Sequence, residues 1–173
     1  MRYQVSQRRG FTLIETIIYV SFLAILSAIA IQSTLVVMNS FYKMRLTQSV
    51  NQSATVGLER MSREIRNAYA IDTTNSVFGT NPGRLTLMTK DSLGANMTIE
   101  FYVNNSELMY KENGVDKGSL MTKNARLTNL VFRQMANPNS QGVRIEMEIR
   151  DTRGVLSESA KFYNTVVLRG SAK

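Results

Sequence analysis

Glu15 is the only charged side chain between Phe11 and Met38, in a stretch that is otherwise rich in Ile, Leu, Val, Ala and Phe. A carboxylate in hydrocarbon costs several kcal/mol unless a cation pairs with it or its side chain reaches water. The chemistry that this placement favours is therefore ion pairing. Either a cation meets Glu15 inside an apolar assembly, or Glu15 lies near an interface and extends into water.

The residue types that perform most enzymatic chemistry are missing. The sequence contains no His and no Cys, which removes the commonest general base, the commonest zinc ligand and every disulfide. It also lacks a Gly-rich phosphate loop and the HExxH and GxSxG motifs. Asp72, Asp91 and Asp116 stand among Asn, Ser and Gly, where calcium can bind, but acids in such surroundings usually serve turns. We expect no enzyme, no cofactor and no metal.

The stretch from Phe11 to Met38 is long enough to cross a membrane as a helix. It would measure about 42 Å at ~1.5 Å per residue, against a hydrocarbon core of ~30 Å. Arg2, Arg8 and Arg9 precede it without any acid, and cationic flanks stay on the cytoplasmic side. We expect a single-pass protein with its N-terminus in the cytoplasm and the remainder outside.

Two common segments share these properties. A secretory signal peptide would use Ala28-Ile29-Ala30 as its A-x-A cleavage site and release a soluble domain after Ala30. The apolar run continues past that site to Val37 and contains an acid, which is unusual for a signal peptide. A plain signal anchor needs neither Gly10 nor Glu15. Both remain alternatives.

The residues Arg8-Arg9-Gly10-Phe11-Thr12-Leu13-Ile14-Glu15 resemble the leader junction of type IV prepilins and pseudopilins. The match needs basic residues, Gly, Phe, the Thr-Leu-Ile triplet and Glu at fixed offsets before a long apolar run. The resemblance implies that prepilin peptidase cuts between Gly10 and Phe11 and methylates Phe11, so that residues 1–10 are a cytoplasmic leader peptide. It also implies that Glu15 neutralises the new amine of a neighbouring subunit in a filament core.

Gly10 fits this interpretation because backbone without a side chain can enter a narrow protease cleft, although a flexible break before the helix would also explain it. Residues 11–38 would form the transmembrane and filament-core helix. Nothing obliges the helix to end there, since the next glycine is Gly57 and the first proline is Pro82.

We expect the helix to run from about Phe11 to about Ala68, with an amphipathic continuation over residues 39–70. Apolar or small residues recur every three or four positions on one face, and charged residues mark a solvent face. We expect the C-terminal region, rather than a coiled-coil partner, to cover the apolar face. The apolar face comprises Leu46, Val50, Ala54, Leu58, Met61, Ile65 and Ala68, and the solvent face comprises Arg60, Arg63, Glu64 and Arg66.

Residues 71–173 form a β-rich head, in which short alternating runs are separated by Asn, Ser, Thr and Gly. The fold class is therefore α+β, a long N-terminal helix packed against an antiparallel sheet. Asn113-Gly114 favours a tight turn and residues 137–142 a longer one. The alternation predicts strands at 96–103 and 143–150, with weaker candidates at 84–89, 107–111, 127–135 and 163–169.

The sequence also resembles J-type pseudopilins and W-type minor pilins in three segments, residues 59–68, 108–111 and 127–132. The chain lacks the C-terminal Cys pair of many major pilins. The resemblance implies a minor pilin or pseudopilin, a structural or priming subunit of a type IV pilus or type II secretion-like filament. Its partners would be prepilin peptidase, other pilins or pseudopilins, and an inner-membrane assembly platform. It would lie in the inner membrane, with a periplasmic or extracellular head, before it joins the filament.

The main rival is a filament-borne subunit that captures DNA for uptake or adheres to a surface. Tyr102, Tyr110 and Lys111 could contribute to such a surface, although cross-strand packing explains them equally well. Of the net charge of +8, three positives lie in the first nine residues, and residues 71–173 carry 13 basic and 10 acidic side chains with the signs interspersed. This distribution argues against dedicated nucleic-acid binding by this chain alone.

Overall fold

The computed structural model describes Gly10, residues 12–137 and residues 140–169. Residues 1–9 and Phe11, the expected leader residues and the expected methylation site, lie outside the described residues. The chain divides into two compact units, one that ends at Phe41 and one that begins at Tyr42. One helix, α1 (Leu13–Asn67), belongs partly to each.

Helix α1 is 55 residues long and agrees with the expected helix to within two residues at each end. Its first turn begins at Thr12, whose carbonyl accepts a hydrogen bond from Thr16 N at 3.2 Å, and its last closes with Ala68 N bonded to Glu64 O at 3.0 Å. No proline interrupts it, and strand β1 (Ala70–Ile71) follows almost directly. The unbroken length of α1 therefore follows from the absence of proline in this part of the sequence.

The head contains two antiparallel sheets where the sequence predicted one. Strand β6 (Ala125–Asn137) pairs with β7 (Ser140–Arg153) and not with β5 (Val115–Ser119), a short exposed strand that sequence reasoning missed because most of its residues are polar. The five-stranded sheet has the order β1 (Ala70–Ile71), β2 (Leu85–Lys90), β3 (Asn96–Asn104), β4 (Glu107–Glu112) and β5 (Val115–Ser119). The three-stranded sheet has the order β6 (Ala125–Asn137), β7 (Ser140–Arg153) and β8 (Leu156–Val167).

Backbone hydrogen bonds join the two sheets along the outer edge of β6. Gly79 N donates to Phe132 O at 2.9 Å and Gly83 N to Leu130 O at 2.8 Å, so the loop before β2 lies along this edge. A side chain at Gly83 would meet Leu130 O at 3.0 Å, which explains the glycine. The bonded loop protects an edge that would otherwise be open to further pairing.

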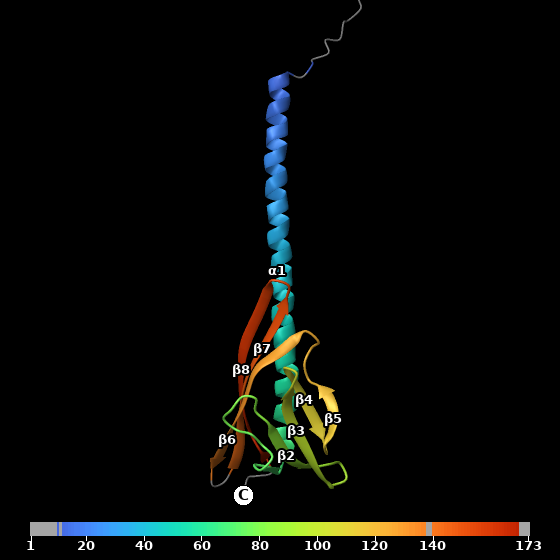
Figure 1. Ribbon diagram of the computed structural model, residues 1–173, viewed down its shortest axis with the longest axis vertical. Coiled ribbons are helices and arrows are strands. Elements are labelled where there is room, and N and C mark those ends of the chain that lie inside the picture. The colour runs from blue at the N-terminus through green and yellow to red at the C-terminus, as the bar shows by residue number, and fades with distance from the viewer. Residues whose placement is uncertain (1–9, 11, 138–139, 170–173) are drawn as a thin grey trace, which may run out of the picture. The chain divides into compact units, whose positions relative to one another are not determined.

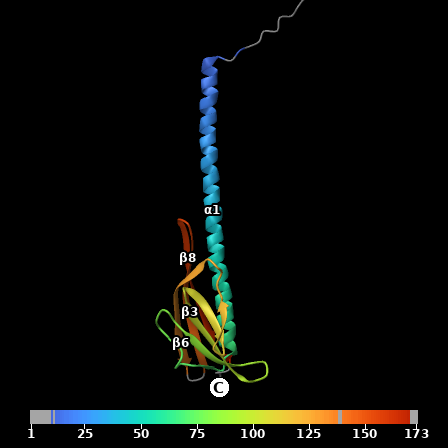
Figure 2. The same ribbon diagram turned by 45° about the vertical axis from the view of Figure 1, so that its right-hand side comes forward.

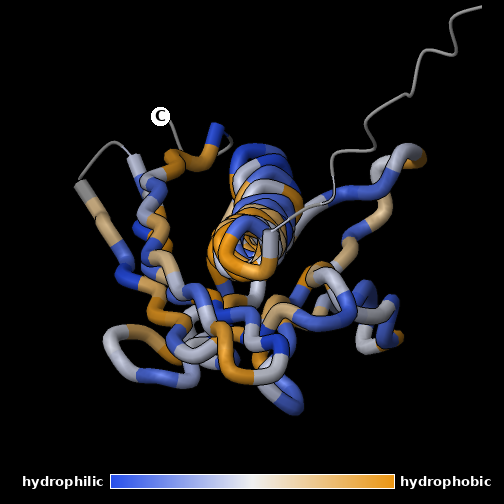
Figure 3. The backbone as a smooth tube through the Cα atoms, turned by 90° about the horizontal axis from the view of Figure 1, so that it is seen from above, coloured by the Kyte–Doolittle hydropathy of each residue, from blue (hydrophilic) through white to orange (hydrophobic). Residues whose placement is uncertain are grey.

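The apolar face of the Tyr42–Asn67 part of α1 packs against both sheets, as the sequence predicted. Five residues of that face, and Ala68 just beyond the helix, are almost fully buried, and Leu58 is partly buried. In Figures 1 and 2 the strands lie beside this part of the helix, and in the view along the helix (Figure 3) they curve round one side of it. The core cluster draws its members from Val50 to Leu168. The unit that begins at Tyr42 therefore contains a complete core, and the α+β fold is confirmed.

Several local predictions differ from the structure in instructive ways. Glu64, expected on the solvent face, is only 8% exposed and pairs with Arg60 Nε at 3.0 Å. Strand β8 begins at Leu156 rather than near Tyr163, because pairing with β7 extends through a polar segment. Ser140 already pairs with Asn137, so the longer turn expected over 137–142 is wrong.

The tight turn at Asn113-Gly114 is confirmed. Both residues have positive φ, 49° and 78°, and they connect β4 to β5. This combination matches the two-residue turn whose twist suits antiparallel strands, and Asn-Gly is its preferred sequence. Local residue preference and tertiary pairing therefore favour the same conformation here.

Candidate functional site

Gly10 is exposed and lies two residues before Thr12, the cap of α1. A Cβ built on it would meet nothing within 4 Å, and its backbone does not occupy the positive-φ region where glycine is favoured. The fold of the described residues therefore gives no reason for glycine at this position. Any requirement for glycine comes from a binding partner or from the flexibility of the chain.

Thr12 and Glu15 form the N-terminal cap of α1. Glu15 N donates to Thr12 Oγ1 at 3.3 Å, which places Thr12 at the cap and Glu15 at the third helical position. The pattern Thr-x-x-Glu is a capping-box sequence, and a carboxylate in the first turn also favours the helix dipole. Sequence reasoning missed this second role of Glu15, although the spacing of the two residues carried the signal.

Tyr19, one turn further along, donates its hydroxyl to Glu15 Oε1 at 3.4 Å. Between Thr12 and Arg45 every described residue is exposed except Glu15, which is partly covered. The acid thus has one weak polar neighbour on its own helix and remains accessible from outside. It can still accept a cation, and no cation among the described residues occupies it.

The apolar part of α1 is long and apolar enough to cross a membrane, and its most apolar window is not buried against any other part of the protein. Five of its hydroxyl side chains bond to carbonyls of the preceding turn. Such bonds make polar side chains tolerable in hydrocarbon. They are formed by Thr16, Ser21, Ser27, Thr34 and Ser40.

The three candidate metal acids of the head serve turns. Asp72 accepts bonds from the backbone of Thr74 and Asn75, and Asp91 from the backbone of Leu93 and Ala95. The side-chain hydrogen bond from Asn75 lowers the pKa of Asp72. Within residues 12–137 and 140–169, no group of three or more acids could hold a metal ion.

Asp116, the third acid, accepts a hydrogen bond from Tyr102 OH at 2.6 Å. This bond raises the pKa of Tyr102 to about 12 and, with the backbone bond from Gly118, lowers the pKa of Asp116. The ammonium of Lys111 lies 4.2 Å from the centre of the Tyr102 ring. The structure therefore brings two of the three candidate surface residues together.

Tyr110, the third candidate, faces the other side of β4. It is buried, its ring stacks on Phe101 and its hydroxyl bonds to Glu112. Arg60 of α1 donates to the Tyr110 hydroxyl at 2.6 Å and to Glu112 at 3.3 Å. Because side chains alternate across a strand, Tyr110 could not share a surface with Lys111. Its role is to bind the sheet to the helix.

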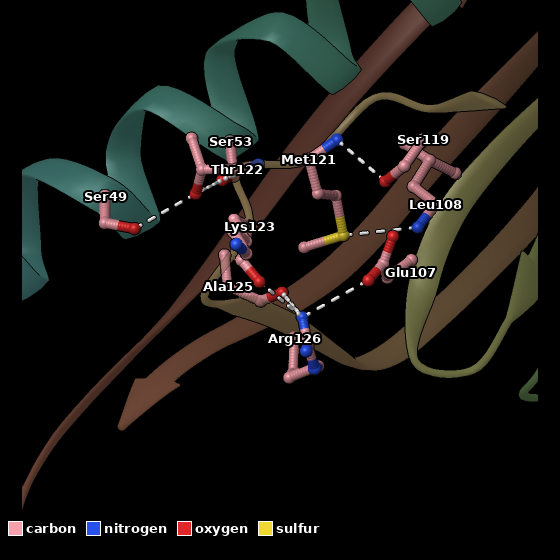
Figure 4. A network of polar contacts seen from close by, with 10 residues as sticks. All are labelled: Ser49, Ser53, Glu107, Leu108, Ser119, Met121, Thr122, Lys123, Ala125 and Arg126. Carbon is pink, nitrogen blue, oxygen red and sulfur yellow. Dashed lines mark hydrogen bonds and ion pairs between the residues drawn. The ribbon is translucent and has the colours of Figure 1, made fainter. Parts of the chain in front are cut away.

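A second polar tie joins α1 to the segment between the two sheets. The hydroxyl of Thr122 lies 3.0 Å from Ser49 Oγ and 2.7 Å from Ser53 Oγ, and Thr122 N donates to Ser53 Oγ at 3.1 Å (Figure 4). Small hydroxyl residues on the helix allow this close approach. No sequence motif predicts these hydrogen bonds, because the partners are far apart along the chain.

The described residues thus offer an accessible carboxylate at the start of an exposed apolar helix, and a head whose polar groups mostly serve packing and turns. No family model, curated protein or solved structure matches this chain.

Proposed function

We propose that this chain is a prepilin-like minor pilin or pseudopilin, a structural or priming subunit of a type IV pilus or type II secretion-like filament. The observation that carries the proposal is the helix surface from Leu13 to Met44, which is exposed, apolar and marked by one acid in its first turn. A monomer in water rarely exposes so continuous an apolar surface. Lipid would cover it in the membrane, and neighbouring helices would cover it in a filament.

In this proposal the subunit starts as a single-pass protein of the inner membrane with its N-terminus in the cytoplasm. Prepilin peptidase removes residues 1–10 by cutting after Gly10 and methylates Phe11. The absence of any fold requirement for glycine at position 10 supports selection by the peptidase. The inner-membrane assembly platform and other pilins are the remaining partners.

Glu15 has the assembly role in this proposal. Cleavage leaves a cationic amine at Phe11, and an accessible carboxylate four residues along can neutralise the amine of a neighbour. Inside an apolar bundle an unpaired charge is strongly unfavourable, so the pairing selects one register between subunits. The carboxylate of Glu15 accepts one long hydrogen bond, from Tyr19, and pairs with no cation among the described residues, which supports this role.

The cleavage step is tested by sequencing the N-terminus of protein isolated from cells that contain a prepilin peptidase. We expect the mature chain to begin at Phe11 with a methylated amine. A Gly10→Val variant should accumulate uncleaved, because its branched side chain would obstruct the peptidase cleft. Protein that retains Met1, or that begins at Ile31 after cleavage following Ala30, would contradict the proposal.

The assembly step is tested by comparing Glu15→Gln with Glu15→Leu. Both variants should be cleaved and remain in the membrane, and both should be missing from sheared filaments, because neither can neutralise an amine. Glutamine can still complete a capping box with Thr12, whereas leucine cannot. Recovery of Glu15→Gln in filaments would assign Glu15 to helix capping and remove its role in assembly.

A further inference from the structure

A recess of about 360 Å³ lies between the Arg45–Gln52 part of α1 and two segments of the head. Each side chain that lines it carries a hydrogen-bond donor, and no acid is among them. The lining comprises Arg45, Gln48, Ser49, Gln52, Thr122, Lys123, Asn124 and Arg153. Guanidinium, ammonium, amide and hydroxyl groups together are the donor set that binds a phosphate.

The positive charge of this recess is largely uncompensated. Arg153 lies 3.6 Å from Asp151, the nearest described acid, which is fully buried beneath it. Arg45 and Lys123 form no ion pair with any described residue, and α1 carries no acid between Glu15 and Glu59. Arg45 and Lys123 therefore supply the net charge.

Hydrogen bonds between α1 and the segment that joins the two sheets fix the shape of the recess. Thr122 is bonded to Ser49 and Ser53, and Lys123 follows it directly (Figure 4). The backbone of Lys123 is also fixed, because its carbonyl accepts a bond from Arg126 at 3.0 Å. The cation of Lys123 is thus presented beside α1 from a fixed backbone.

The position of the recess along the chain identifies its ligand. Phe41 and Tyr42 follow the apolar stretch, and aromatic residues are typical of the membrane interface. Arg45 comes one turn later, about 6 Å along the helix, and a headgroup layer is roughly 5–8 Å thick. Lys43 and Arg45 lie on the non-cytoplasmic side of the apolar stretch, where cations are usually fewer, so their presence there needs an explanation of its own. Cations within the headgroup layer lie next to lipid phosphates.

We propose that this recess binds the phosphate of an anionic phospholipid headgroup, and so docks the head on the membrane that anchors the chain. The inference rests on one part of the proposed function, that the apolar stretch spans a membrane. The turn between β7 and β8 would lie close to the lipid, because Arg153 ends β7 and lines the recess. Val155 in that turn is fully exposed, as an apolar side chain that touches lipid can be.

The test uses the full chain in nanodiscs. Because the sequence has no Cys, Val155→Cys places one fluorophore at the turn. Lipids spin-labelled on the headgroup should quench it in phosphatidylcholine nanodiscs that contain phosphatidylglycerol, and much less in phosphatidylcholine alone. Removing both cations with Arg45→Gln and Lys123→Gln should weaken docking by about fivefold for each charge lost. Both side chains are exposed, so the fold should not change.

The matched control is the pair Arg63→Gln and Arg66→Gln, which removes two exposed cations of the same helix that line a different recess. This control should quench like the parent. Equal quenching with and without phosphatidylglycerol, or an equal loss in both pairs, would overturn the inference. Release by inorganic phosphate but not by chloride at equal ionic strength would support recognition of the phosphate group, whereas equal release by both salts would show a non-specific charge effect and overturn the inference.

The inference and the proposed function fail separately. A chain that is cleaved at Phe11 and assembled normally, but shows no lipid-dependent quenching, would remove only the inference. A chain that retains its first ten residues, yet docks in response to phosphatidylglycerol, would remove the proposed function and leave the inference intact.

Discussion

At the scale of single residues, one hydrogen-bonded pair in the head shifts the ionisation of both its members. Tyr102 and Asp116 come from different strands, β3 and β5, and share a short hydrogen bond. The bond favours the protonated phenol and the ionised carboxylate together. It therefore stabilises the folded state fully in the pH range above the pKa of an unfolded aspartate and below that of an unfolded tyrosine.

We predict that Tyr102 ionises near pH 12 in the folded head and that Asp116→Asn lowers its pKa, because the hydrogen bond to a carboxylate is the main cause of the raised value. Ultraviolet absorbance of tyrosinate during alkaline titration measures it, with Tyr102→Phe identifying the signal. The stability that this bond contributes should be complete between about pH 5 and about pH 10, disappear as the pH rises through about 12, and also be lost at acid pH as Asp116 is protonated. An unchanged titration in Asp116→Asn would contradict the assignment.

At the scale of elements, the helix and the two sheets meet most closely at Gly57. A Cβ there would lie 3.0 Å from Leu108 Cδ2 of β4 and 3.7 Å from Met147 Cε of β7. The glycine is buried in a helix, where it costs about 1 kcal/mol relative to alanine. Its presence is explained by packing, since both sheets touch the helix at one position.

We predict that Gly57→Val destabilises the head by about 2 kcal/mol, because two additional methyl groups must displace Leu108 and Met147 in a filled core. Urea unfolding followed by circular dichroism measures the change. Thr55→Val, an exposed position on the same helix, is the control and should stay within about 0.5 kcal/mol of the parent. A Gly57→Val head as stable as the control would show that this contact is looser than the structure indicates.

At the scale of the whole molecule, the two units depend on different solvents. The unit that begins at Tyr42 buries its apolar residues internally, whereas the described part of the other unit exposes nearly all of them. Water suits the first and an apolar environment suits the second. A continuous helix, α1, contributes to both.

We predict that a fragment comprising residues 42–173 is soluble, monomeric and cooperatively folded, because its core needs nothing from residues before Tyr42. The full chain should need detergent. Light scattering and urea unfolding test the fragment. A shorter fragment that begins at Leu58 loses Leu46, Val50 and Ala54 from the buried face of the helix and should not fold. Cooperative unfolding of the shorter fragment would show that this part of the helix is dispensable.

The sequence by itself determined α1, its buried face and the Asn113-Gly114 turn, because helical period, absent breakers and turn preference are local properties. It also supplied the junction from Arg8 to Glu15, on which the proposed function rests. Thr12 as the cap of α1 could have been read from the same local pattern.

Only the tertiary structure decided how the strands divide into two sheets, which face of β4 Tyr110 occupies and that Glu64 is buried. It alone brought Arg45, Lys123 and Arg153 to one recess. These features depend on contacts between residues far apart in sequence, whose energies rest on burial and geometry that no local pattern encodes.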